Sequence, residues 1–469
     1  MEAGNSLHQV STGIDSLDEV IGGFPRGGLI VVSGGPGSGK TIFSSRFLYT
    51  GVVTHGERGI YVSFAENKET FYKHMLQFGW DFKGIEEKGM FKFLDMVTVR
   101  EEGTSTVINR ILDNVYSLDA KRLVIDSYTA LTQAFREEVD SRILLHTILG
   151  KITNQLGCTA LLIVETMKRM EGPGRLEEFV ADGVITLKRR VIRGRVMREL
   201  EIVKMRGQKI LHPQYIFTLN EGFRIFKKWV HIPVKERERF KPLPDREGYY
   251  STGIRDLDDL LNGGYPKGAT VVITIDSNVP REAYESMISA TVCNFANKGR
   301  GVVYLPTRGV DATMIREVYK GFVDEEAFGK KFFIMQYARG EKKPYMVMLD
   351  GTVKDLEMAI EALEESEKDG DVWLGVVGWD QVEATYDLDV VKRILNEMTI
   401  LVRRLKYLGL FFAKSDSKML KELVDLADIH LSIKMVDGSL VLIGEKPFTP
   451  ICHIDFRGDP SQIEITPII

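Results

Sequence analysis

The sequence predicts an α/β protein of two tandem domains, each a mostly parallel twisted sheet flanked by helices. Short apolar runs alternate with segments of helical spacing, which is the pattern of a parallel sheet covered on both faces. The motif Ser-Thr-Gly-Ile at residues 11–14 recurs at residues 251–254, so the second half repeats the first. The length of 469 residues exceeds a single hydrophobic core and fits two domains of ordinary size.

The expected strands are short, β-rich apolar runs. In the first half they lie at residues 29–33, 59–64, 122–125, 160–164, 183–187 and 200–203. In the second half they lie at residues 271–275, 301–305, 374–377, 408–413 and 427–433. Between the halves, residues 233–247 are charged, contain prolines and lack apolar periodicity, so we expect a linker there. The predicted domains are therefore residues 1–232 and 248–469.

A complete phosphate-binding loop follows the first expected strand. It reads Gly34, Gly35, Pro36, Gly37, Ser38, Gly39, Lys40 and Thr41. Glycines let backbone N–H groups close around phosphates, Lys40 neutralises the charge of the β- and γ-phosphates, and the Thr41 hydroxyl is a ligand for Mg²⁺. Residues 42–49 have helical spacing, which gives the strand–loop–helix context that this motif requires. We predict a nucleotide site formed by this loop and by Ile42 at the start of the helix.

The second half carries a degenerate copy of this loop. The register of the repeat places Ile275, Pro280, Arg281 and Glu282 at the positions of Gly34, Gly39, Lys40 and Thr41. Isoleucine and proline prevent close approach of the backbone to phosphate, proline lacks an N–H donor, and glutamate repels phosphate. We therefore expect one working nucleotide site per chain.

Two carboxylates are candidates for the chemistry of the working site. Asp126 directly follows the strand at 122–125, so with Thr41 it is placed to hold Mg²⁺ and its water shell. Glu66 lies just past the strand at 59–64 and is our candidate for orienting and deprotonating water. The site thus predicts hydrolysis of a nucleotide with Mg²⁺ as cofactor.

Composition excludes several classes of protein. The 62 basic and 66 acidic residues leave a formal charge of −4, so no overall field indicates a nucleic-acid partner. Three widely spaced cysteines argue against a disulfide framework or a zinc site and favour a reducing compartment. No signal sequence is recognised, and no apolar run approaches the ~20 residues that a membrane span needs. We expect a soluble, cytoplasmic protein without a membrane partner.

The motifs of the first half, in their order and spacing, resemble those of the KaiC-like branch of RecA-type ATPases. They are the loop at 34–41, Phe78-Gly79-Trp80-Asp81, Asp126-Ser127, the segment 178–185 and Lys204-Met205-Arg206-Gly207. The resemblance covers nearly all of the first half but only the layout of the second. It implies a RecA-like core that binds ATP between the subunits of a homo-oligomeric ring, which is hexameric in the clock protein of the family.

The resemblance also implies roles for particular residues. Lys204, Met205 and Arg206 would contact the nucleotide of the neighbouring subunit, with Lys204 and Arg206 reaching its γ-phosphate. Arg198 lies near the position of another family arginine. Family members usually have two adjacent acids where this chain has Ala65 and Glu66, so we expect slow hydrolysis.

The second half departs from the family at every chemical position. Arg308 stands in place of Glu66, Gly378 falls near the position of Asp126, and residues 444–446 replace 204–206. Asp380 lies two residues late, and a metal site there is not favoured because the phosphate loop is lost. Ser415 and Ser417 lie near the stretch where the clock protein phosphorylates itself. Without a catalytic carboxylate or phosphate loop beside them, we expect surface serines and no autokinase activity.

The sequence leaves three functions open. The first, which we favour, is an ATP-driven regulatory switch whose inert half presents a surface to an unknown protein partner. The second is a nucleic-acid-handling recombinase or helicase, because RecA-type cores serve both activities. The third is a transcription-linked regulator similar to the gas-vesicle regulatory ATPases of archaea, which share this loop.

Two segments bear on nucleic-acid binding. The loop before the fifth strand sets Lys168, Arg169 and Arg175 against Glu171, Glu177 and Glu178, so it forms no basic funnel. Residues 188–198, in contrast, are strongly basic and free of acids. For this basic segment we favour a hairpin packed at a subunit interface beside Lys204 over a contact with nucleic acid.

Overall fold

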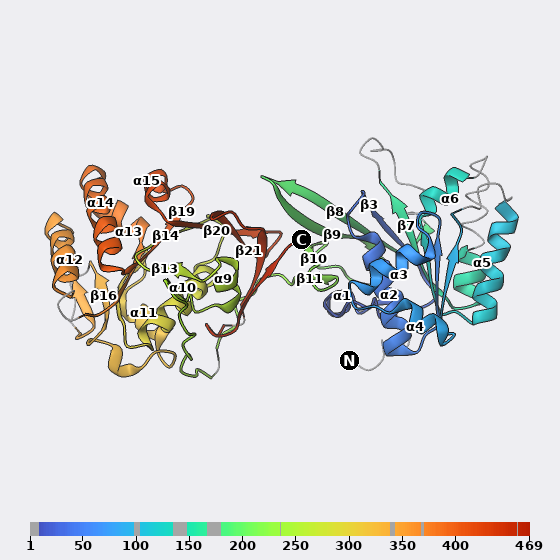
Figure 1. Cartoon of the computed structure of the whole chain (residues 1–469), viewed down its shortest axis with the longest axis horizontal. Coiled ribbons are helices and arrows are strands. Elements are labelled where there is room, and N and C mark those ends of the chain that lie inside the picture. The colour runs from blue at the N-terminus through green and yellow to red at the C-terminus, as the bar shows by residue number, and fades with distance from the viewer. Residues whose placement is uncertain are drawn as a thin grey trace. The chain divides into compact units, whose positions relative to one another are not determined.

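The protein divides into two compact units. The computed structural model describes residues 9–97, 104–134, 148–166, 180–234, 236–337, 343–366, 370–456 and 458–469. The first unit comprises Met1–Lys227 with Ile468–Ile469, and the second comprises Lys228–Pro467 (Figure 1). Each unit is a largely parallel sheet with flanking helices, which confirms the predicted fold class.

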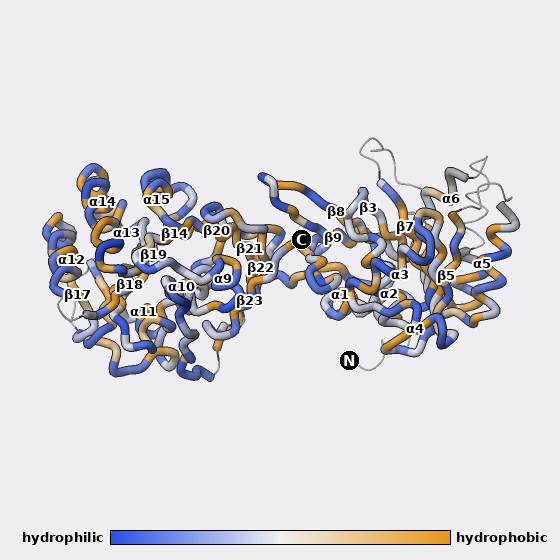
Figure 2. The backbone as a smooth tube through the Cα atoms, in the orientation of Figure 1, coloured by the Kyte–Doolittle hydropathy of each residue, from blue (hydrophilic) through white to orange (hydrophobic). Residues whose placement is uncertain are grey.

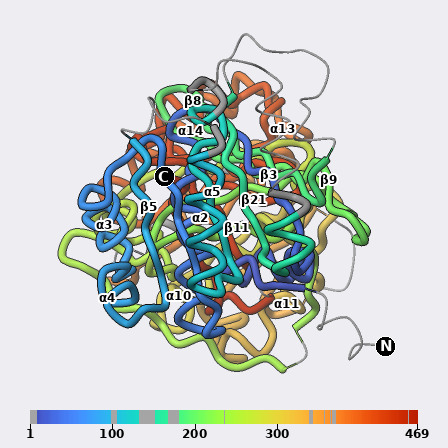
Figure 3. The backbone as a smooth tube through the Cα atoms, turned by 90° about the vertical axis from the view of Figure 1, so that its right-hand side faces the viewer, coloured from blue at the N-terminus to red at the C-terminus, as the bar shows by residue number. Residues whose placement is uncertain are grey.

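The first unit is built on a nine-stranded sheet in the order β11-β10-β9-β8-β3-β7-β6-β4-β5. Strands β3 to β8 are parallel, and β8 to β11 pair antiparallel. In Figure 3, β5 and β9 lie on opposite sides of this unit. The strands are β3 (Leu29–Gly34), β4 (Gly59–Ser63), β5 (Phe91–Asp95), β6 (Arg122–Asp126), β7 (Thr159–Glu165), β8 (Gly183–Ile192), β9 (Arg195–Met205), β10 (Gln214–Thr218) and β11 (Arg224–Ile225). A separate pair joins β1 (Gln9–Val10) and β2 (Phe24–Pro25).

Helices cover both faces of this sheet. The helices are α1 (Asp15–Ile21), α2 (Lys40–His55), α3 (Lys68–Leu76), α4 (Phe82–Glu87), α5 (Thr104–Leu118), α6 (Tyr128–Ala134) and the π-helical segment η3 (Ile148–Gln155). Buried side chains of α2, α3 and α4 share one apolar cluster with one face of the sheet. Those of α5 and α6 share another cluster with the opposite face. Strand β3 is therefore buried along its whole length, which fixes the position of the loop that follows it.

The second unit repeats this plan on a ten-stranded sheet in the order β17-β16-β15-β18-β19-β14-β20-β21-β22-β23. Its strands are β14 (Thr270–Ile275), β15 (Gly301–Leu305), β16 (Phe332–Gln336), β17 (Met346–Met348), β18 (Trp373–Gly378), β19 (Leu408–Lys414), β20 (Ile429–Val436), β21 (Ser439–Lys446), β22 (Ile451–Phe456) and β23 (Ile463–Pro467), with the pair β12 (Tyr249–Tyr250) and β13 (Tyr265–Pro266) outside the sheet. From β16 to β22 the order matches that from β5 to β10 in the first unit. The duplication seen in the sequence is thus a duplication of topology.

The helices of the second unit are α9 (Arg255–Leu260), α10 (Arg281–Ala296), α11 (Ala312–Tyr319), the 3₁₀ turn η4 (Glu325–Ala327), α12 (Val353–Ser366), α13 (Trp379–Thr385), α14 (Leu388–Leu405) and α15 (Leu420–Leu426). Figure 2 shows hydrophobic stretches along the strands of both units and mixed hydropathy along the helices. Among the described residues, no helix combines the length and hydropathy required to cross a bilayer.

Each predicted strand coincides with an observed one, with shifts at the ends. The largest shifts are in β8 and β9, which extend well beyond the predicted runs because they form a long hairpin. The sequence did not predict β5, β16 and β17, nor the antiparallel strands after β9 and β20.

The segment predicted as a linker belongs to the second unit. Phe240 is buried with 4% exposure, and the Asp245 carboxylate accepts a hydrogen bond from the Lys298 amino group at 2.6 Å and pairs with Arg300. The division between the units falls earlier, after Lys227. Arg239, Asp245 and Arg246 of this segment form ion pairs with residues of the second unit.

Candidate nucleotide-binding site

The geometry of the loop after β3 explains its glycines. A Cβ atom at Gly34 would lie 2.5 Å from the carbonyl oxygen of Leu187, so only glycine fits there. Gly37 and Gly39 have φ angles of +68° and +102°, a region that favours glycine. Helix α2 begins at Lys40, directly after this turn. Its first backbone N–H groups and the loop N–H groups therefore face a common space, which is the arrangement that binds phosphate.

Lys40 is held over this loop. Its ammonium group donates to the carbonyl oxygens of Gly34 and Gly35, each at 2.9 Å. Burial lowers the pKa of Lys40, while the nearby carboxylates of Glu165 and Asp126 oppose that shift. The Lys40 ammonium group is thus held at the mouth of the loop.

Asp126 and Thr41 meet at the carboxyl end of β6. The Thr41 hydroxyl donates to a carboxylate oxygen of Asp126 at 3.0 Å, and the Tyr61 hydroxyl donates to the same oxygen at 2.5 Å. Burial raises the pKa of Asp126, and the hydrogen bonds from Tyr61 and Thr41 oppose that rise. A hydroxyl and a carboxylate in contact beside a phosphate loop form a donor set that suits Mg²⁺ completed by phosphate oxygens and water. No cluster of three or more His, Cys, Asp or Glu side chains suited to a metal occurs among the described residues.

Glu66 lies after β4, where its backbone N–H donates to the Ser63 hydroxyl at 3.0 Å. Its carboxylate pairs with the His74 ring at 2.8 Å. The candidate base is therefore positioned by a neighbour on α3 that the sequence did not indicate.

Glu165 is a second carboxylate at the loop, and it was not among the residues predicted from the sequence. It ends β7, and the register of β3 and β7 sets it opposite Gly34. Its charge acts on both Lys40 and Asp126. The available signal was a carboxylate directly after an expected strand, the same signal that identified Asp126.

The structure separates Lys204, Met205 and Arg206 from the phosphate loop of their own chain. The sheet register joins Met205 to Gly183, and Gly183 to Ile30 near the start of β3. The loop begins at the other end of that strand, roughly 13 Å away at the usual rise of a β-strand. Arg206 instead donates to the Asp182 carboxylate at 3.0 Å and stays 57% exposed. These residues therefore lie at the opposite end of the sheet from their own loop.

The basic segment 188–198 forms the tip of the β8–β9 hairpin. Arg193 and Gly194 make its turn with φ angles of +49° and +80°. The hairpin extends past the phosphate loop, whereas Lys204 lies at the opposite end of β9, so the expected position beside Lys204 is wrong. The reason is that β8 runs parallel to β3 toward the loop and β9 returns antiparallel to it. The start of β9 therefore lies at the loop end of the strands, and Lys204 lies at the other end.

Two arginines of this hairpin adjoin the loop. The Arg198 guanidinium, on a residue only 8% exposed, donates to the carbonyl oxygen of Gly37 at 2.9 Å. The Arg189 side chain lies 3.9 Å from the point where a Cβ at Gly37 would be. On the other face, Lys188 pairs with Glu201 and Arg190 with Glu199. The segment's charge is thus partly neutralised and partly directed at the loop. Residues 168, 169, 171, 175, 177 and 178, whose balance of charge was considered above, lie outside the described residues.

The corresponding place in the second unit has different chemistry. Helix α10 begins at Arg281, whose guanidinium lies 3.6 Å from the carboxylates of Glu282 and Glu285. Burial raises the pKa of Glu285 to about 7. At the end of β18, a Cβ on Gly378 would lie 2.6 Å from the Thr307 backbone nitrogen, so protein fills the place of a metal carboxylate.

The residues near this degenerate loop are engaged with one another. Asp380 accepts a hydrogen bond from the Arg308 backbone N–H at 3.3 Å, and burial raises the pKa of Asp380. The Ser417 hydroxyl donates to Glu383, and Ser415 is exposed. The arrangement resembles the first site in topology but not in chemistry.

Parts of both units match models of known protein families. A KaiC ATPase family model matches residues 10–228, and a model of basic region 2 of GvpD matches residues 239–328. A UPF0273 protein of Methanopyrus kandleri is 34% identical over 51% of this chain and 100% of its own length. Another of Pyrococcus horikoshii is 36% identical over 42% of this chain and 85% of its own length.

The circadian clock oscillator protein KaiC of Synechococcus elongatus is 30% identical over 69% of this chain, which spans 63% of the clock protein's length. A crystal structure of a KaiC-like protein from Pyrococcus horikoshii is 32% identical, with a TM-score of 0.42, and the match covers 47% of this chain and 99% of that one. Together with the match of the first unit to the KaiC ATPase model, the relation to the two UPF0273 proteins shows that the chain belongs to the KaiC-like family of RecA-type ATPases.

Proposed function

We propose that the chain is a regulatory ATPase that binds ATP and hydrolyses it slowly, at one site per chain. The observation that carries this proposal is the contrast between the two units. The first has Lys40 held over a glycine loop beside the contact of Thr41 with Asp126. The second has Arg281 paired with glutamates at the same place in the topology.

In this proposal, loop N–H groups and Lys40 bind the β- and γ-phosphates of ATP. Thr41 and Asp126 hold Mg²⁺, which when bound neutralises developing phosphate charge. The contact of the Asp126 carboxylate with the Thr41 hydroxyl supports a role in metal binding, because carboxylate and hydroxyl oxygens are ligands that Mg²⁺ accepts.

We propose that the site is completed by a second copy of the chain. Lys204 and Arg206 lie at the opposite end of the strands from their own loop. In this proposal they contact the nucleotide bound by a neighbouring subunit. Arg206 is well exposed there, as a residue that acts on a neighbour must be. A closed ring, hexameric as the family resemblance implies, lets every site be completed in the same way.

The test of this function is phosphate release together with molar mass in solution. We expect ATP-dependent release of phosphate by an assembled species, and little release by a monomer. Release that is the same per chain for monomer and assembly would overturn the interface site while leaving ATP hydrolysis intact.

The match of residues 239–328 to a GvpD region favours a second candidate, a transcription-linked regulator. In that case the second unit would present the surface that meets a protein partner, and ATP would control it from the first unit. Co-purification from the native organism with and without ATP distinguishes the two, because a transcription factor would be recovered only for the second.

Glu66→Gln is expected to keep ATP binding and to lower turnover by roughly 10²-fold, the usual scale for a general base. The reason is the position of Glu66 after β4, with His74 orienting its carboxylate. Single-turnover hydrolysis measures the effect. Glu69→Gln, in the first turn of α3, serves as control. If Glu66→Gln is unchanged and Glu165→Gln is slow, then Glu165, opposite Gly34, activates the water.

We expect weak, salt-sensitive binding of single-stranded nucleic acid at best, lost when Arg189, Arg190 and Arg193 are all changed to alanine. The formal charge of −4 and the pairing of Arg190 with Glu199 leave little free basic surface on the hairpin. Fluorescence anisotropy of a labelled single strand across a salt series measures this binding. Tight, ATP-stimulated binding at physiological salt would favour a recombinase instead.

A further inference from the structure

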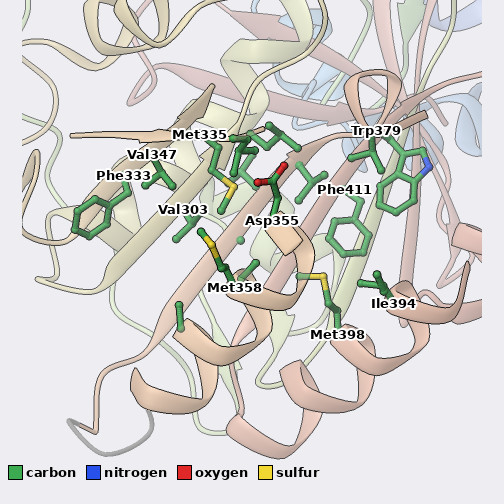
Figure 4. Close-up of a pocket in the computed structure, with 18 of the residues that line it drawn as sticks. Val303, Phe333, Met335, Val347, Asp355, Met358, Trp379, Ile394, Met398 and Phe411 are labelled. Atoms are coloured by element: carbon green, nitrogen blue, oxygen red, sulfur yellow. The ribbon is translucent and has the colours of Figure 1, made fainter. Parts of the chain in front are cut away.

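The second unit contains an apolar cavity of about 410 Å³. It lies between one face of the sheet and helices α12, α13 and α14. Figure 4 shows Val303 and Phe333 on the sheet side, with Met358 and Met398 reaching in from the helices. The volume is that of a small-molecule site. Helices α12 and α14 pack against each other beside it.

The first unit shows that this cavity is not a necessary consequence of the fold. On the corresponding face there, Ile60, Val62 and Leu123 are completely buried beneath α5. In the second unit, Val303 and Phe333 are only half-buried. An apolar void of this size forfeits packing along its whole lining, so a ligand that fills it would be bound favourably.

One end of the cavity carries an ordered polar chain. The Tyr337 hydroxyl donates to the Tyr386 hydroxyl at 2.8 Å, which donates to the Asp355 carboxylate at 3.0 Å. Asp355 also accepts the backbone N–H groups of Gly351 and Thr352 at 2.7 and 3.2 Å, so it is fully engaged. Burial raises the pKa of Tyr337 to about 12, so its hydroxyl stays protonated. With its hydrogen committed to Tyr386, the Tyr337 oxygen can still accept a hydrogen bond.

The charge of the lining selects among apolar ligands. Among the described residues that line the cavity, Asp355 carries the one charge and no side chain is cationic. A carboxylate or phosphate head group would therefore enter without a counter-charge and beside a buried carboxylate. We propose that the second unit binds a neutral, hydrocarbon-rich small molecule with a single hydroxyl group, which donates to Tyr337. Met335, Met358 and Met398 would adapt to its shape.

Calorimetric titration of the full chain with 1-decanol and with decanoate tests the head group, because the two share a chain and differ in charge. We expect decanol to bind at least about tenfold more tightly. Tyr337→Phe should remove most of that difference, whereas Tyr116→Phe, at a site 76% exposed in the first unit, should not. Equal or tighter binding of decanoate would overturn the assignment of the ligand class.

Gly375→Leu tests the location. Gly375 lies on β18 in the cavity wall, and a Cβ atom added there meets no atom within 4 Å, so the leucine should enter the cavity without a clash. We expect decanol binding to be lost with the far-ultraviolet circular dichroism spectrum unchanged. Lys354→Leu adds the same side chain at an exposed position of α12 outside the lining and should bind like the parent. Undiminished binding by Gly375→Leu, or no decanol binding by the parent chain, would overturn the site.

Discussion

Replacing Lys40 by alanine is expected to abolish ATP binding by the whole chain. Lys40 is the lysine of the intact loop, and its ammonium group is fixed by the Gly34 and Gly35 carbonyls at 2.9 Å. Its loss removes a charge-assisted contact to phosphate from a buried site. The degenerate loop cannot compensate, because Arg281 there faces Glu282 and Glu285. Calorimetric titration with ATP and Mg²⁺ should show no heat of binding.

Arg281→Ala is the matched control, since it changes the corresponding position in the second unit. We expect it to bind ATP like the parent. Lys40→Met keeps an apolar side chain of similar length, so it is a check against a folding defect. It lacks the ammonium group and should therefore also fail to bind ATP. Residual binding of one nucleotide per chain in both Lys40 variants would show that a second site exists.

Arg206→Ala is expected to lower ATP turnover by roughly 10³- to 10⁵-fold, the range found when an arginine that stabilises transferring phosphate is removed. The physical reason is that Arg206 lies at the opposite end of the sheet from its own loop, and in our proposal it acts on the loop of a neighbouring subunit. Steady-state phosphate release by the assembled protein measures the loss. Lys209→Ala, a basic residue three positions further along, provides the control and should retain activity.

Mixing Arg206→Ala chains with Glu66→Gln chains tests whether this arginine acts between subunits. Each variant alone is expected to be nearly inactive. In mixed assemblies some interfaces combine an intact Glu66 with an intact Arg206, so activity should reappear. If mixed assemblies form and stay inactive, Arg206 has no role in a neighbouring site.

Local sequence was enough to predict those site residues that directly follow an apolar run. The spacing of glycines, Lys40 and Thr41 after an apolar run predicted the loop. The position of Asp126 directly after the run at 122–125 suggested that it shares Mg²⁺ with Thr41, and the structure brings the two side chains into contact. The duplicated plan was also predictable, because the repeat at 251–254 and the order of apolar runs survive in the second half.

The remaining features depend on which strands are neighbours. Glu165 meets Lys40 only because β7 pairs with β3, and a residue's own sequence context does not give that pairing. The hairpin contact of Arg198 with Gly37 follows in the same way from the register of β8 beside β3. The cavity in the second unit depends on how closely α12 and α14 cover the sheet, which periodicity alone does not determine.

The central claim is that this chain hydrolyses ATP at a single site in its first unit, and phosphate release tests it most directly. The parent chain and Lys40→Ala are compared at the same concentration with saturating ATP and Mg²⁺. We predict steady release by the parent and none above background by the variant. Equal release by the two proteins, or no release by the assembled parent, would contradict the claim.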